Sequence, residues 1–152
     1  MWKTEHSVET KASASSVWGV LADADGWPSW NPGLASAHLD GPLQNGTTGK
    51  TIQASGQKGN FTVTDVRQGA RFVNEAKVPG ALLRFQHTIE ALDKARTRVT
   101  LGATLDGPMA RIWGLIFGRT IAGYLPTAVR QLAARAEAAC TAATHPSGAG
   151  QV

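Results

Sequence analysis

One histidine lies where its imidazole could do chemistry. The run from Ala81 to Leu92 alternates in polarity, as a strand with one buried face does. Its register places His87 on the same face as Phe85 and Ile89. An imidazole among apolar neighbours is either a hydrogen-bonded core residue or a group that orients a ligand or shuttles a proton. Desolvation should lower its pKa unless an acid pairs with it, and His87 is therefore the candidate catalytic residue.

Asp65 is the acid that could share this environment. It points inward, beside Phe61 and Val63, only if the strand that begins near Asn60 continues without interruption. A β-bulge near Val66 would reverse its direction. We favour the surface position, which leaves the partner of His87 open.

Other chemistry has little support in the sequence. The chain contains no His-Glu-x-x-His, Cys-x-x-Cys, Gly-x-Ser-x-Gly or phosphate-binding glycine-lysine motif. The four histidines are dispersed, so a metal site would need ligands that converge from distant parts of the chain. We therefore expect no metal and no cofactor.

Aromatic side chains are concentrated in one short segment, where Trp27, Pro28, Trp30 and Pro32 fall within six residues. Each proline fixes its own φ and pushes the preceding residue toward extended geometry, so no regular helix is expected to run through the segment. The result is a stiff connector that carries two large apolar side chains. These tryptophans either anchor the connector or line a cavity entrance.

This segment resembles the N-terminal signature of the START-like (SRPBCC) superfamily, in its polyketide cyclase/dehydrase and lipid-transport group. The resemblance rests on Val17-Trp18 in the first helix and on an aspartate that precedes the run from Trp27 to Pro32. It extends over roughly residues 2–140 through the order of strands, turns and last helix. One departure is Ser13, where the family usually has proline, but serine also caps helices well. The resemblance implies a helix-grip fold.

Hydrophobic periodicity and the spacing of turn residues predict the secondary-structure elements that carry these side chains. The sequence predicts an α+β fold with about seven antiparallel strands in a curved sheet wrapped around a long C-terminal helix. A first helix from Ser13 to Ala22 and a second small helical element follow the first strand. The expected strands are Trp2–Thr10, Ala35–Leu39, Lys50–Ala54, Asn60–Val66, Phe72–Lys77, Ala81–Leu92 and Thr97–Leu105. One domain should span residues 1–143, with a disordered tail over 144–152.

The last helix is expected over roughly Ile121–Thr141, joined by a hinge at Pro126 and the preceding glycines to a shorter helix before it. Its apolar face is half alanine. Either the helix approaches the sheet closely or a cavity remains between them. A sheet that curls around its helix favours a cavity, and ligand sites usually measure about 300–1,000 Å³.

The candidate ligand-binding residues are mostly the aromatic and apolar side chains that should face this space. For Tyr124 we weigh a packed ring with a solvated tip against a hydroxyl presented at the hinge. The full set is Trp27, Trp30, Phe61, Val63, Phe72, Phe85, His87, Ile116, Tyr124 and Val129.

Composition narrows the partners. The formal charge is +4, but the basic residues are scattered and no nucleic-acid motif accompanies them. The most apolar run, Ile112–Leu125, contains Arg119 and is too short to cross a bilayer. The single cysteine, Cys140, cannot form an internal disulfide, and the N-terminus lacks a signal-peptide core. We expect a cytoplasmic protein with no nucleic-acid partner and no membrane span, and the sequence leaves the oligomeric state open.

Two function hypotheses remain. The first is binding or carriage of an apolar small molecule, such as a lipid, a polyketide or an aromatic compound, between the sheet and the last helix. The second is a polyketide cyclase/aromatase or dehydratase acting in the same cavity, which the resemblance also allows. Catalysis needs a polar pair that can move protons, and the sequence offers only His87 with no certain partner. We favour binding, and whether the protein is an enzyme stays open.

Overall fold

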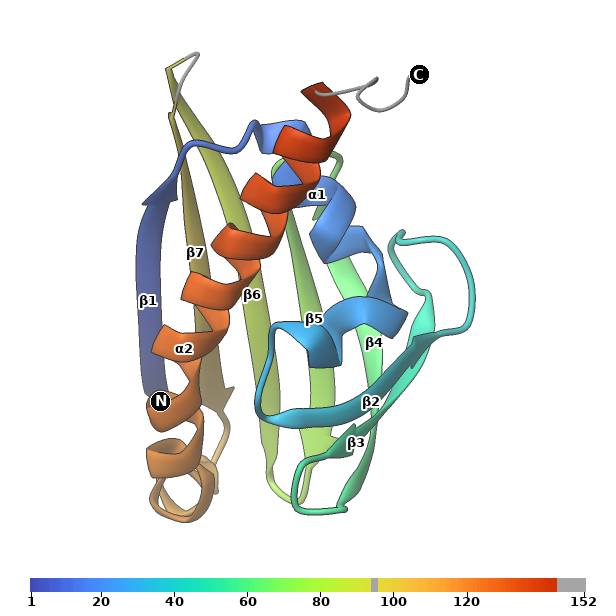
Figure 1. Cartoon of the computed structure of the whole chain (residues 1–152). Helices are drawn as coiled ribbons and strands as arrows, with labels where there is room; N and C mark the ends of the chain where they lie inside the picture. Colours follow the sequence, from blue (N-terminus) through green and yellow to red (C-terminus); the bar gives the residue numbers. More distant parts are fainter. Residues whose placement is uncertain (94–95, 145–152) are drawn as a thin grey trace.

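The computed structural model describes residues 1–93 and 96–144, and a curved antiparallel sheet wrapped around a long helix dominates it (Figure 1). The sheet has seven strands in the order β1-β7-β6-β5-β4-β3-β2. The strands are β1 (Trp2–Thr10), β2 (Leu34–Leu39), β3 (Thr48–Gln53), β4 (Lys58–Arg67), β5 (Arg71–Val78), β6 (Ala81–Asp93) and β7 (Arg96–Asp106). The predicted helix-grip architecture is confirmed. Of the tail predicted over 144–152, residues 145–152 lie outside the described part.

Two short helices follow β1, as predicted. The first, α1 (Ala14–Ala22), is capped by Ser13, whose hydroxyl accepts a hydrogen bond from the Ser16 amide at 3.1 Å. The second is a 3₁₀-helix, η1 (Ala24–Ser29), which contains Pro28. The expectation that no regular helix runs through this segment was wrong for its first half. A 3₁₀-helix of only six residues tolerates proline because few backbone amides in it need a helical acceptor.

The C-terminal helix, α2 (Ala110–Thr144), is longer than predicted and continuous through Pro126. The predicted hinge is therefore wrong. Two of the glycines that suggested it are packing positions: a Cβ on Gly114 would lie 3.0 Å from the Trp2 ring, and one on Gly118 would lie 2.8 Å from it. Glycine lets α2 approach the first strand, and that packing outweighs its weak helix propensity.

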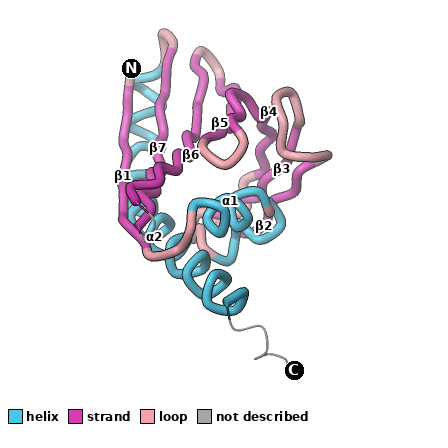
Figure 2. The backbone as a smooth tube through the Cα atoms, turned by 90° about the horizontal axis from the view of Figure 1, so that it is seen from above, coloured by secondary structure: helices cyan, strands magenta, loops and turns pink. Residues whose placement is uncertain are grey.

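The core lies on the concave side of the sheet, between its strands and the helices (Figure 2). Helix α2 contacts β1 and β7, whereas η1 contacts β2 near the opposite edge. Seen from above, the strands curve around this space. Large side chains with no more than 2% exposure, such as Leu21, Trp30 and Phe72, fill much of it.

Candidate functional site

A cavity of about 70 Å³, measured as the volume open to the centre of a water molecule, lies on the concave side of the sheet. Its walls come from η1 and the segment after it, from strands β2 to β7, and from the middle of α2. The lining residues are Trp27, Trp30, Asn31, Leu34, Thr51, Gln53, Phe61, Asn74, Ala76, Phe85, Gln86, His87, Leu101, Gly102, Tyr124 and Leu125. The wall is mostly apolar and aromatic.

The cavity is smaller than the sequence suggested. At roughly 10–15 Å³ per water centre, it would hold about five to seven waters, or a compound the size of one substituted ring. The cavity lies below the usual range of about 300–1,000 Å³ for ligand sites because aromatic rings occupy much of the space. The Trp27 ring lies 5.7 Å from the Phe61 ring and 6.1 Å from the Phe72 ring, centroid to centroid.

The alanine face of α2 does not border the cavity. Ala128 and Ala136 are fully buried, yet neither lines it, and the helix meets the cavity at Tyr124 and Leu125 instead. Close approach of the helix to its neighbours, the alternative that we did not favour, therefore describes this stretch. Small side chains here allow close packing.

His87 is buried and lines the cavity, on the face that the strand alternation predicted. Its ring stacks on Phe72 at 4.1 Å and 9°, and Nδ1 lies 3.3 Å from the Phe72 carbonyl oxygen. Because a carbonyl only accepts, the hydrogen of the neutral ring belongs on Nδ1 and Nε2 keeps its lone pair. Burial lowers the pKa of His87 to about 4, although the carbonyl opposes the shift. His87 is a neutral acceptor near pH 7.

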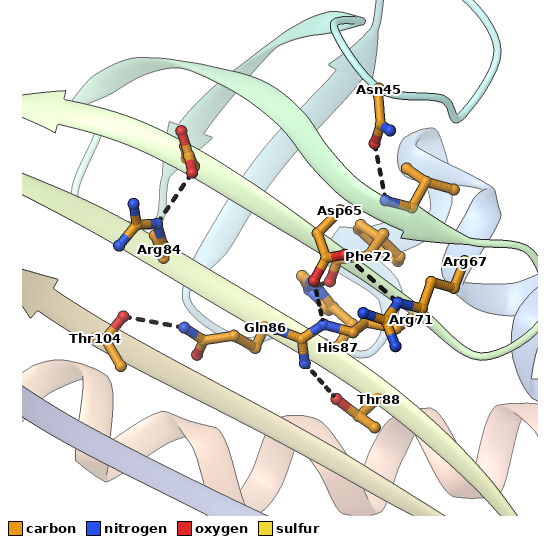
Figure 3. A network of polar contacts seen from close by, with 12 residues as sticks. Asn45, Asp65, Arg67, Arg71, Phe72, Arg84, Gln86, His87, Thr88 and Thr104 are labelled. Carbon is orange, nitrogen blue, oxygen red and sulfur yellow. Dashed lines mark hydrogen bonds and ion pairs between the residues drawn. The ribbon is translucent and has the colours of Figure 1, made fainter.

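Asp65 does not pair with His87. A β-bulge between Thr64 and Arg67 interrupts the register, and Asp65 has a φ of 49° there. Its carboxylate lies 2.6 Å from Arg71 Nε and 3.6 Å from Arg67 Nε, so its ion-pair partners are arginines (Figure 3). The hydrogen bond from Arg71 lowers the pKa of the Asp65 carboxyl. The surface position that we favoured agrees with this geometry.

Two buried polar atoms of residues that line the cavity have no hydrogen-bond partner among the described residues. They are the Trp30 indole nitrogen, Nε1, and the Asn74 amide oxygen, Oδ1. Trp30 is 2% exposed and Asn74 is 8% exposed. Sequence reasoning did not single out Asn74. The signal was present, because Asn74 shares the inward face of β5 with Phe72.

The remaining candidates divide between the cavity and its surroundings. Phe61, Phe85 and Tyr124 line it together with both connector tryptophans. Burial raises the pKa of Tyr124 to about 12, so its phenol stays neutral.

Four of the predicted binding residues do not line the cavity. Val63, Phe72 and Val129 are at most 1% exposed and belong to the packed core around it. Ile116 is 56% exposed on α2, near the 85% exposed Leu115. Its exposure does not fit the expectation that Ile116 faces the cavity.

In the described part of the chain, no group of three or more histidine, cysteine, aspartate or glutamate side chains is arranged to hold a metal ion. Nor does that part contain a helix of the length and hydropathy needed to span a membrane.

Comparison with known proteins places this geometry in context. The family model described as polyketide cyclase/dehydrase and lipid transport matches residues 1–139. A search of curated protein sequences found no significant match.

Several solved structures share the fold. A protein from Thermobifida fusca, solved by NMR, is 22% identical with a TM-score of 0.68, and the match covers 91% of this chain and 95% of that one. A START superfamily protein from Mycobacterium smegmatis is 16% identical with a TM-score of 0.66, covering 90% and 98%. The Zhui aromatase/cyclase from a Streptomyces species is 18% identical with a TM-score of 0.69, covering 90% and 93%. At these identities the likeness establishes the fold alone.

Proposed function

The chain belongs to the polyketide cyclase/dehydrase and lipid transport family, and we propose that it binds or carries a small apolar molecule in the cavity between η1, the sheet and α2. The observation that supports this most is the cavity itself. Aromatic and aliphatic side chains line most of it, while a few polar atoms are placed at defined points. Ligand sites commonly have this composition.

The ionisable groups favour binding over catalysis. His87 and Tyr124 are the only ionisable side chains among the lining residues. A proton-transfer group works best with a pKa near the working pH, whereas the pKa of His87 falls to about 4 and that of Tyr124 rises to about 12. Neither group exchanges protons readily near pH 7. The cyclase/aromatase or dehydratase alternative therefore lacks a matched acid–base pair in this cavity.

The small volume limits the ligand. A compound about the size of one substituted ring fits the cavity as it stands, whereas a fused-ring polyketide or a long acyl chain would need the wall to open. Among lipids, polyketides and aromatic compounds, we therefore propose that a compact aromatic compound, or the aromatic end of a larger molecule, occupies the site.

A thermal-shift screen tests the proposal. Single-ring aromatics, naphthols and long-chain fatty acids would each be added to the purified protein. At 100 times its Kd, a ligand should stabilise the fold by about 2.7 kcal/mol, or roughly 5–10 °C in Tm for a chain of this length. Single-ring compounds should give the largest shifts for a given concentration.

The variant Ala76→Leu tests whether the ligand binds in this cavity, because Ala76 lines the cavity and a larger side chain would fill part of it. This variant should fold and lose most of the ligand-dependent shift. The proposal fails if no compound raises Tm, or if Ala76→Leu responds as strongly as the unmodified protein.

A further inference from the structure

The unpaired polar atoms at the cavity indicate what the ligand must carry. Trp30 Nε1 can only donate a hydrogen bond, and Asn74 Oδ1 can only accept one. Both atoms are buried without a partner among the described residues, and both side chains line the same cavity. Leaving such groups unpaired is costly, and native proteins seldom do so without a reason.

The unpaired indole N–H of Trp30 differs from the indole N–H groups of two other tryptophans, which are hydrogen-bonded. Trp27 donates from its indole nitrogen to the Leu21 carbonyl at 2.8 Å, and Trp113 donates to the Pro79 carbonyl at 2.7 Å. The fold therefore provides acceptors for these two indoles. Trp27 lines the same cavity as Trp30, so lining the cavity does not by itself leave an indole unpaired.

The charge of the lining excludes ionised ligands. No lysine, arginine, aspartate or glutamate borders the cavity. Burial lowers the pKa of His87 to about 4, so His87 supplies no positive charge near pH 7. A carboxylate or an ammonium group would be buried there without a counter-ion, which is strongly unfavourable.

We infer that the ligand is a neutral single-ring compound with a hydroxyl group, a phenol, whose oxygen accepts from Trp30 and whose hydrogen is donated to Asn74. A hydroxyl is the smallest neutral group that both donates and accepts. This inference rests on the proposed function and specifies the ligand class of the same cavity.

The test compares two probes of equal size, 4-methylphenol and 1,4-dimethylbenzene, by isothermal titration calorimetry. They differ in one hydroxyl replaced by a methyl group. A purely apolar cavity would prefer the hydrocarbon, because the hydroxyl must leave water without compensation. With Trp30 and Asn74 as partners, 4-methylphenol should bind at least about fivefold more tightly than 1,4-dimethylbenzene.

Two independent variants locate the preference. Asn74→Leu removes the acceptor while keeping the branching and the number of heavy atoms, and Trp30→Phe removes the indole donor. Each should reduce the preference for 4-methylphenol about threefold or more. Trp113→Phe is the matched control, since it removes an indole donor that is paired with Pro79 outside the cavity lining. It should leave both affinities unchanged.

The outcomes separate the two proposals. Equal binding of the two probes, or tighter binding of 1,4-dimethylbenzene, overturns the hydroxyl inference and keeps an apolar binding site. A preference for 4-methylphenol that survives in both Asn74→Leu and Trp30→Phe overturns the assignment to these two residues. If neither probe binds and no compound of the thermal-shift screen does, the proposed function fails first.

Discussion

The concave space of this protein has two halves, one packed solid and one that surrounds a cavity. The packed half, formed by Val17, Leu21, Val63 and Phe72, is fully buried and lines no cavity. The cavity half, formed by Trp30, Asn74, Phe85 and Tyr124, surrounds an opening of about 70 Å³. His87 lies at the boundary between them, because its ring stacks on Phe72 and also lines the cavity.

The difference lies in what each half leaves unsatisfied. The packed half consists of apolar side chains in mutual contact, with the Trp18 ring packed edge-on to Phe72 at 5.9 Å. The cavity half contains two polar atoms without partners among the described residues. The packed half therefore contributes mainly to stability, whereas the cavity half leaves polar atoms unpaired at some cost in stability.

The largest effect should come from emptying the packed half. Phe72→Ala removes a fully buried ring and should lower the free energy of unfolding by about 3–5 kcal/mol. Phe85→Ala, a matched change on the neighbouring strand β6, should cost less because that ring already borders open space. Urea unfolding of both variants measures the difference. An equal loss would show that the two halves are packed alike.

The next effect concerns His87 at the boundary. Its pKa is about 4 in the folded chain against 6.5 as the ordinary value, so above pH 6.5 both states are neutral and the group adds no pH dependence. Between pH 6.5 and 4, His87 is protonated in the unfolded chain but stays neutral in the folded chain. The free energy of unfolding should therefore fall by about 3 kcal/mol over this range.

The control is His87→Phe, which keeps a ring against Phe72 and removes the titration. The difference in unfolding free energy between the two proteins, measured by urea unfolding from pH 7.5 to 4, isolates His87 from the other acids and bases. A difference that does not change with pH would mean that His87 has the same pKa in the folded and unfolded chains, and would contradict its desolvation by burial.

A smaller effect should follow from altering one wall of the cavity half. A methyl group on Gly49 would overlap the Phe61 ring, which covers that glycine. Gly49→Ala should push the ring toward the cavity, at a cost of about 1–3 kcal/mol in unfolding free energy, and weaken ligand binding. Gly59→Ala, on the paired strand β4, meets only a threonine hydroxyl at 3.2 Å and is the matched control. Unchanged ligand binding in Gly49→Ala would contradict the role of Phe61 as a wall.

The smallest effect has the opposite sign. Asn74→Leu replaces an amide whose oxygen is unpaired with an apolar side chain of the same branching, whose extra volume the neighbouring cavity can take, so the free energy of unfolding should stay equal or rise by about 1 kcal/mol. Thermal unfolding without ligand measures this. A loss of stability larger than 1 kcal/mol would mean that Asn74 has a structural role in the packed half.

The same comparison explains what the sequence could predict. Alternation along β6 placed His87 on the inner face, and the serine at position 13 marked the start of α1, because both signals are local. The start of α2 was missed because Gly114 and Gly118 weaken a helix locally, while their value lies in contact with Trp2 from the other end of the chain.

The cavity was harder to predict than the fold. Its volume depends on how the rings of Trp27, Phe61 and Phe72 fill the concave space, and sequence periodicity carries no information about ring packing. Asn74 was visible as a polar residue on an inward face, but its lack of a partner is a property of the assembled structure. A polar residue at an apolar position of a strand therefore deserves the same scrutiny as a buried histidine.

NMR of the Trp27 and Trp30 indoles tests most directly whether the cavity is the binding site. The Trp30 and Trp27 indole N–H signals would be assigned from the loss of each in a Trp→Phe variant, and then followed during titration with 4-methylphenol. The Trp30 signal should move as its hydrogen bond to the ligand forms. The Trp27 signal should move much less, because the Trp27 indole N–H already donates to the Leu21 carbonyl. A titration in which neither indole moves, or in which only signals of the exposed Leu115 region of α2 respond, would contradict the assignment of the cavity half as the binding site.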